Sequence, residues 1–256
     1  MEIPKMIQMG AAAFLLSGVA MADAVDLSSW SDTSGGNWTV QGTGNDSVYQ
    51  SVNGTPTIFH NNLDSQGLAL SGEITVQTTS DDDFIGFVLG YNTGDLTNAS
   101  ADYMLIDWKQ GNQTAYSAYG AAGLAISHVE GVLGTTDAWG HSGNVTQIAR
   151  ANNLGSTGWI DNQTYSFDLI FTESLIKVFV DGVEELSILA QTLGLESFNN
   201  GSFGFYNFSQ GNVLYAGIEE NIAPPAVVPV PAAAFLFAPA LLGFMGLRRK
   251  AKNSVA

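Results

Sequence analysis

Three consecutive aspartates, Asp81 to Asp83, form the grouping of residues in this chain that most suggests chemistry. They directly precede the uncharged segment 84–92, and adjacent carboxylates repel one another more strongly beside an apolar core. Clustered carboxylate oxygens suit Ca²⁺, which takes about six to eight oxygen ligands in irregular geometry and would offset the repulsion. We therefore expect a calcium site at Asp81, Asp82 and Asp83. The alternative is a solvated strand end whose charges discourage edge pairing.

Asp107 is a candidate additional ligand, provided that its strand lies near the three aspartates. The alternative, which we favour for Asp107, is an outward-facing surface carboxylate. The three histidines, His60, His128 and His141, are isolated and share no spacing typical of metal ligands. We expect each histidine to be structural rather than catalytic.

Paired carboxylates would be needed for glycoside hydrolysis, with the acid and the nucleophile on one face of a strand. Glu184 and Glu185 are adjacent, as are Glu219 and Glu220, so each pair points to opposite faces of a strand. The chain also lacks a Gly-x-Ser-x-Gly elbow, a His-Glu-x-x-His motif and a phosphate-binding loop. The sequence therefore predicts a protein that is not an enzyme.

Exposed aromatic rings would be needed by a glycan-binding protein, because sugar faces stack on rings. The available residues are Trp30, Trp38, Trp108, Trp139 and Trp159, with Tyr116 and Tyr119 in a polar stretch. The alternative is that most of these aromatic side chains fill the core, and we favour this for Trp108 and Trp159.

Strands must position these residues. Apolar side chains alternate with others over 165–171 and again over 175–180, as in half-buried strands. Asp181-Gly182 predicts a tight hairpin turn, with 183–189 as the returning strand. A second pair is expected from 203–208 and 213–218. The segment 84–89 is apolar on both faces, which predicts a central strand covered on both sides.

Charge and cysteine content limit the functional classes. Residues 23–223 hold 23 acidic residues against three basic ones, a formal charge of −20. Such a surface repels nucleic acid and anionic lipid and attracts cations. There is no cysteine, so a hydrophobic core must stabilise the fold without disulfides. About 200 residues of short strands and polar turns predict an all-β protein, a β-sandwich or jelly roll.

Both ends read as targeting signals. Residues 1–22 combine Lys5, an apolar stretch and a small-residue cleavage site, as a secretory signal peptide does. At the other end, a proline-rich linker spans 224–231 and a short apolar helix spans 232–247. The basic tail 248–256 fits retention on the cytoplasmic side.

The C-terminal arrangement resembles the PEP-CTERM sorting tail of Gram-negative bacteria, although Val230 stands where the motif has glutamate. The resemblance implies an exosortase-type sorting protease as a partner. It also implies transient anchoring in the inner membrane by the short transmembrane helix.

The body resembles the C-terminal domain of thrombospondins, a lectin-like β-sandwich. The carrying stretches are VYQSVN (48–53), DDDFIGFVLGY (81–91), YMLIDWKQ (103–110), WGHSGN (139–144), GW (158–159) and GFYNFSQ (204–210). Their order and spacing match across about 47–220. The resemblance implies a lectin-like, concanavalin-type jelly-roll domain over 23–223.

Together these observations predict an exported, non-enzymatic, lectin-like and calcium-binding protein, located in the cell envelope or outside the cell. We expect it to act in cell adhesion or the extracellular matrix, with an extracellular polysaccharide or matrix component as partner. Two alternatives remain: a structural matrix component without glycan specificity, and a glycoside hydrolase.

Overall fold

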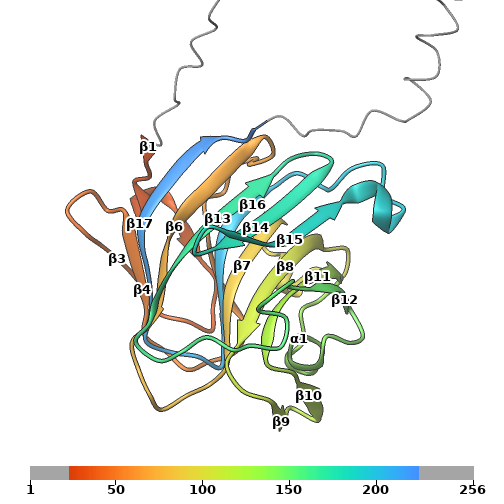
Figure 1. Ribbon diagram of the computed structural model, residues 1–256, viewed down its shortest axis with the longest axis horizontal. Helices are drawn as coiled ribbons and strands as arrows, with labels where there is room; N and C mark the ends of the chain where they lie inside the picture. Colours follow the sequence, from red (N-terminus) through yellow and green to blue (C-terminus); the bar gives the residue numbers. More distant parts are fainter. Residues whose placement is uncertain (1–22, 225–256) are drawn as a thin grey trace, which may run out of the picture. The chain divides into compact units, whose positions relative to one another are not determined.

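The computed structural model describes residues 23–224. The predicted signal peptide and nearly all of the predicted linker, apolar helix and basic tail lie outside these residues. Two large antiparallel sheets pack face to face (Figure 1), which confirms the predicted all-β, jelly-roll β-sandwich. Within residues 23–224, none of the helices has the length and apolar character needed to cross a membrane.

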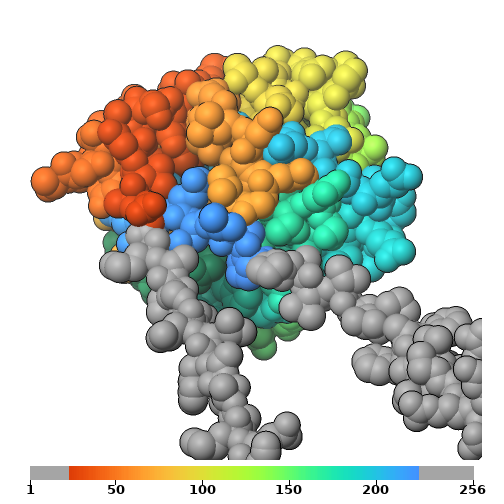
Figure 2. Space-filling model, turned by 90° about the horizontal axis from the view of Figure 1, so that it is seen from above, coloured from red at the N-terminus to blue at the C-terminus, as the bar shows by residue number. Residues whose placement is uncertain are grey.

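The first sheet has the strand order β15-β14-β13-β6-β17-β4-β3, with β1 added alongside β17. Figure 2 shows the start of the described chain, in red, beside β17, in blue. The strands are β1 (Asp23–Ala24), β3 (Trp38–Gln41), β4 (Ser47–Gln50), β6 (Leu68–Val76), β13 (Thr164–Phe171), β14 (Leu175–Val180), β15 (Val183–Leu189) and β17 (Val213–Ile222).

The second sheet has the strand order β12-β11-β8-β7-β16-β5-β2. Its strands are β2 (Ser31–Asp32), β5 (Thr57–His60), β7 (Phe84–Tyr91), β8 (Asp102–Lys109), β11 (Gly123–Glu130), β12 (Val145–Arg150) and β16 (Ser202–Phe208). The remaining elements are the hairpin β9 (Gln113–Ala115) and β10 (Ala118–Gly120), the helix α1 (Thr135–Gly140), and the 3₁₀ turns η1 (Leu27–Ser29), η2 (Asp95–Thr97) and η3 (Ala190–Leu193).

Strand β7 lies in the middle of the second sheet, between β8 and β16, and all eight of its residues are buried. Ile85, Phe87 and Leu89 face the core between the two sheets. Phe84 and Val88 face a second apolar cluster, which Trp139 of α1 helps to cover. The prediction of a central strand covered on both sides is confirmed.

The strands β13 and β14 and the turn between β14 and β15 also agree with the sequence. Asp181 and Gly182 both have positive φ, at 50° and 73°. The sequence-based pairing of 203–208 with 213–218 is wrong, because β16 and β17 belong to different sheets. Their apolar rows meet across the core, where the rings of Phe205 and Tyr215 stack with centroids 4.4 Å apart. The connecting segment 209–212 therefore crosses from one sheet to the other.

Candidate functional site

The three aspartates converge just before β7. One carboxylate oxygen from each of Asp81, Asp82 and Asp83 lies within 4.8 Å of the others. Asp83 is buried, whereas Asp81 and Asp82 are half-buried. The carboxylate of Asp81 accepts a hydrogen bond from the side-chain amide of Asn53. The structure therefore brings together three of the four residues predicted as metal ligands.

A buried lysine neutralises part of this cluster. Lys109, the last residue of β8, has its Nζ 2.5 Å from Oδ1 of Asp83 and 3.4 Å from Oδ1 of Asp82. The same ammonium lies 4.6 Å from the ring centroid of Trp139 and 5.4 Å from that of Phe84. Cation–π contacts of this kind strengthen where water is excluded. Lys109 thus supplies an internal cation at the buried end of the cluster.

The outer end of the cluster keeps an excess of negative charge. The pKa of Asp81 is raised from 3.8 to about 6, chiefly by partial burial and then by the charge of Asp83 and a hydrogen bond with it. The charge of Asp82 contributes in the same direction. A carboxyl whose pKa is raised by neighbouring carboxylates is stabilised by an added cation. Within residues 23–224, Lys109 forms ion pairs with Asp82 and Asp83, whereas Asp81 forms none.

Asp107 does not join this cluster. Its Oδ2 lies 2.9 Å from Nε2 of His141, the C-cap residue of α1. Burial alone would lower the pKa of His141, but the charge of Asp107 and hydrogen bonds to Asp107 and Gln147 outweigh burial and raise it. Asp107 is also buried, so it is not the outward-facing carboxylate that the sequence alternative described. The Asp107–His141 pair fastens α1 to the second sheet.

The outer face of the second sheet carries further buried polar atoms near Asp107. Gly86 lies between Asp107 and Tyr206 in the strand register. A Cβ at Gly86 would meet the carbonyl oxygen of Ile106 at 2.0 Å, so only glycine allows β7 and β8 to approach so closely. Within residues 23–224, Oδ1 of Asp107 and the hydroxyl of Tyr206 find no hydrogen-bond partner. Burial, with the charge of Asp107, raises the pKa of Tyr206 well above its ordinary value.

The other two histidines are held by neighbouring side chains. Nε2 of His128 lies 2.7 Å from Oδ1 of Asp102, and Nδ1 of His60 lies 3.4 Å from the hydroxyl oxygen of Ser202. Burial lowers the pKa of His60. No histidine belongs to the carboxylate cluster found in the described chain.

Most of the candidate glycan-binding aromatics lie in the core. Trp30, Trp108 and Trp159 are buried between the two sheets, and Trp38 packs against the same core. Trp139 is buried on the outer face of the second sheet. Tyr116 and Tyr119 are the only exposed aromatic residues among residues 23–224.

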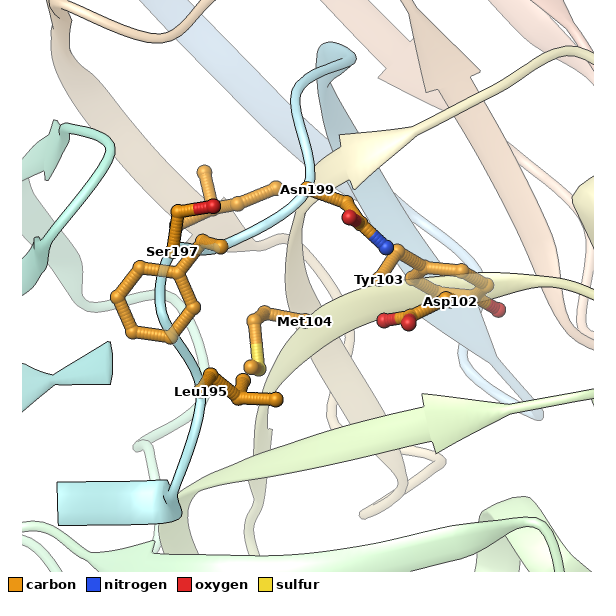
Figure 3. Close-up of a pocket in the computed structure, with 8 residues that line it drawn as sticks. Asp102, Tyr103, Met104, Leu195, Ser197 and Asn199 are labelled. Carbon is orange, nitrogen blue, oxygen red and sulfur yellow. The ribbon is translucent and has the colours of Figure 1, made fainter. Parts of the chain in front are cut away.

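A small cavity of about 40 Å³ lies beside β8, against the segment 195–199. Figure 3 shows the side chain of Met104 pointing toward Leu195, with Asp102 and Tyr103 on the other side of the cavity. Pockets that bind small molecules typically have volumes of about 300–1,000 Å³. The cavity is therefore too small for a sugar ring.

Lys109 is the residue of this site that sequence reasoning missed. A signal was present, because Lys109 is one of only three basic residues in 23–223 and follows the apolar run 103–106, with Asp107 two positions before it. Side chains two apart on a strand share a face. The two charges therefore had to lie on one buried face together.

Comparisons with known proteins agree with this architecture. The model of the thrombospondin C-terminal region matches residues 33–223. Thrombospondin-2 of Gallus gallus is 29% identical over 196 residues, covering 72% of this chain and 16% of that protein. Cartilage oligomeric matrix protein of Homo sapiens is 26% identical over 196 residues, covering 71% of this chain and 25% of that protein. The chain thus matches about a quarter or less of the length of these relatives.

Solved structures share the fold at low sequence identity. A carbohydrate-binding module from Bacillus subtilis matches with a TM-score of 0.54 and 10% identity, covering 75% of this chain and 95% of the module. A Bacillus subtilis protein of unknown function with a galectin-like fold matches with a TM-score of 0.51 and 8% identity. The match covers 79% of this chain and 95% of that protein. With a family model that covers most of the described residues, this chain belongs to the family of the thrombospondin C-terminal region.

Proposed function

We propose that this chain is an exported, non-enzymatic, lectin-like domain that binds calcium and acts in cell adhesion or the extracellular matrix. Membership of the thrombospondin C-terminal family and a fold shared with a carbohydrate-binding module support a binding role. The observation that carries the calcium part is the convergence of the carboxylates of Asp81, Asp82 and Asp83, of which Asp81 forms no ion pair within residues 23–224.

The donor atoms at the cluster fit calcium. Carboxylate oxygens are hard ligands, and Asp81 and Asp82 are half-exposed, so water can complete an irregular coordination shell. Asp83 is buried against Lys109 at 2.5 Å, whereas the carboxylate of Asp82 is more exposed and 3.4 Å from Lys109, so Asp81 and Asp82 are the main ligands in this proposal. Asp107 is assigned no ligand role, because it pairs with His141. Bound calcium would hold the segment before β7 in place against the repulsion of its carboxylates.

Thermal unfolding of the full-length chain in calcium and in magnesium tests this proposal. A ligand that binds only the folded state stabilises it by about 2.7 kcal/mol at a hundredfold excess over Kd. Calcium should raise the unfolding temperature more than magnesium at equal ionic strength, because magnesium fits irregular loops poorly. Asp81→Asn and Asp82→Asn should abolish the calcium-specific increment.

Asp32→Asn is the matched control, because Asp32 is an exposed aspartate on the edge strand β2. Asp83→Asn is unsuitable, since it would leave Lys109 buried without its carboxylate. Equal responses to calcium and magnesium, or an increment that survives in both variants, would reduce Asp81–Asp83 to a solvated strand end.

A glycan array separates the lectin-like proposal from the structural alternative. Binding to specific glycans supports the first, while assembly without glycan binding supports a structural matrix component. Release of reducing sugar by the purified protein would favour the glycoside hydrolase instead.

Export and sorting belong to the same proposal. A signal peptide at 1–22 and a sorting tail at 224–256 would deliver the body to the cell envelope or the outside, with an exosortase-type protease as the processing partner. The matrix protein named among the relatives supports an extracellular location.

A further inference from the structure

The β9–β10 hairpin carries the two exposed aromatic residues of residues 23–224. Tyr116 is 43% exposed and Tyr119 is 59% exposed. Along β10 the exposure alternates, because Ala118 and Gly120 face α1 and Tyr119 faces away from it. A Cβ at Gly120 would approach Nε1 of Trp139 to 2.9 Å, so the hairpin lies tightly on that indole. Tyr119 is therefore exposed on the side of the hairpin that faces away from α1, while the other side packs against Trp139.

Several contacts hold this hairpin in one position. Nε1 of Trp139 donates to the carbonyl oxygen of Gln113 at 3.3 Å, and Oγ1 of Thr136 donates to that of Tyr116 at 3.0 Å. The buried ammonium of Lys109 donates to Oε1 of Gln113 at 3.1 Å. A surface that is already ordered loses little conformational entropy when a ligand binds. The hairpin, which Figure 1 shows beside α1 at one end of the sandwich, is preorganised.

The turn of the hairpin keeps a tyrosine at an unfavourable position. Tyr116 and Ser117 both have positive φ, at 50° and 63°. Turns of this kind strongly favour Asn-Gly, and a bulky residue with positive φ is an outlier. Part of the Tyr116 ring packs on Trp139 and Phe208, each with centroids 5.1 Å apart, yet the side chain stays exposed. Strained residues that persist in a structure point to a functional constraint.

The segment that forms the hairpin has no charged residue, in contrast to the acidic body around it. Residues 110–127 contain no charged residue, in a body with a formal charge of −20. The charged side chains nearest the hairpin and its helix are held by partners within the protein. Lys109 is buried against Asp82 and Asp83, and Asp107 pairs with His141. The carboxylate of Asp137 accepts from the backbone N–H of Asn144. The exposed polar side chains around the tyrosines are hydroxyls and amides, those of Asn112, Gln113, Thr114 and Ser117. This composition matches an uncharged partner that is rich in hydroxyl groups.

We propose that the β9–β10 hairpin binds a neutral polysaccharide, with Tyr119 and Tyr116 stacking against sugar rings. The proposal rests on the lectin-like function proposed above and assigns it a site and a ligand class. The negative face of a tyrosine ring attracts the partly positive C–H groups of a sugar. An anionic polysaccharide would be repelled by the acidic body.

A protein partner fits this surface less well. A stable protein interface needs roughly 20–30 residues on each side. The hairpin offers only the eight residues 113–120. The hairpin is therefore better suited to a sugar chain than to a protein partner.

A second candidate site for a sugar is a groove of about 420 Å³ at β1 and β17. It has no aromatic residue in its wall and carries Asp23 and Glu220. The hairpin is therefore also a better candidate for sugar binding than the groove at β1 and β17.

Binding of the full-length chain to cellulose, curdlan, dextran and starch tests the proposal, with alginate as the anionic comparison. Tyr119→Ala and Tyr116→Ala should each weaken binding to the preferred neutral glycan by about tenfold or more. Tyr119→Phe should stay within about twofold, because the ring is retained. Val183→Ala is the matched control, since Val183 is an exposed apolar residue at another hairpin. Circular dichroism checks that each variant is folded.

The outcomes separate this site from the general function. Weaker binding by both alanine variants, with Tyr119→Phe and Val183→Ala unchanged, supports the hairpin site. Neutral glycan binding that both alanine variants retain overturns the hairpin site and leaves the lectin-like function standing. A wild-type chain that binds none of the five polysaccharides, or binds only alginate, overturns the hairpin proposal, and a negative glycan array in addition overturns the lectin-like function.

Discussion

The ammonium of Lys109 lies 2.5 Å from Oδ1 of Asp83, and both side chains are buried. Lys109 comes from the end of β8 and Asp83 from the residue before β7, so the pair joins neighbouring strands at the edge of the acidic cluster. Three adjacent carboxylates beside an apolar strand are tolerated because one of them faces this internal cation. Within residues 23–224, Asp81 forms no such ion pair, and we propose that a second cation binds there.

Lys109→Met should lower the free energy of unfolding by about 3–5 kcal/mol, because it leaves Asp83 buried without its partner. Lys177→Met is the matched control: Lys177 pairs with Glu184 at 2.6 Å at the surface, where such pairs contribute about 0–1 kcal/mol. Urea unfolding at pH 7 measures both variants. Similar small losses would mean that the Lys109–Asp83 pair adds little to stability.

The raised pKa of Asp81 predicts a pH dependence without calcium. The folded protein binds the Asp81 proton more tightly than the unfolded chain, so stability falls as the pH rises from about 4 to about 6. Asp81→Asn should remove this part of the slope in urea unfolding. Asp168 and Glu220, whose pKa values burial also raises, contribute in the same direction, so the difference between wild type and variant is the quantity to follow. If the free energy of unfolding depends on pH in the same way for wild type and for Asp81→Asn, the prediction is contradicted.

The raised pKa of His141 predicts a second pH dependence. Protonated His141 pairs with Asp107, so its contribution to stability is complete below the unfolded pKa of 6.5 and is lost as the pH rises through the folded pKa. His141→Asn keeps a residue that tolerates the left-handed backbone at this position, where φ is 46°. The wild type should lose stability above about pH 6.5 relative to this variant. A constant difference between pH 6 and pH 9 would exclude the mechanism.

Phe87→Ala should cost about 3–5 kcal/mol through lost burial and a residual cavity. The ring of Phe87 lies in the core between the sheets, 4.6 Å from that of Phe167 by centroid distance. Val183→Ala, on an exposed turn, should change stability by less than about 0.5 kcal/mol. Urea unfolding compares the two. A loss below about 1 kcal/mol for Phe87→Ala would be inconsistent with its place in the core.

The predicted targeting signals imply that the mature protein lacks both ends. Intact-mass measurement of protein from the native host should show a start near Asp23 and loss of the tail beyond 229–231. The physical reason is the pair of apolar segments with basic outer flanks, which are typical of export and retention signals. A stable full-length product in the medium would contradict the sorting hypothesis.

Local pattern alone was enough for much of the fold. The alternation in 165–171 and 175–180 identified β13 and β14, and Asp181-Gly182 identified the turn after them. The apolar character of both faces of 84–89 identified the central strand β7. These features depend on neighbours in sequence, because a strand's side chains alternate and a tight turn needs residues that accept positive φ. The triad Asp81–Asp83 is likewise a local feature.

Tertiary structure decided which elements meet. The alternation of a strand fixes its faces but not its partner, so β16 and β17 could be assigned to one hairpin until the two sheets were seen. Lys109 and Asp83 are 26 residues apart, and Asp107 and His141 are 34 residues apart. Strand register and the position of α1 bring each pair together, and a charge becomes buried only when its partner arrives. The sequence therefore identified the acidic residues, while the packing of distant segments determined which of them face a cation of the protein's own.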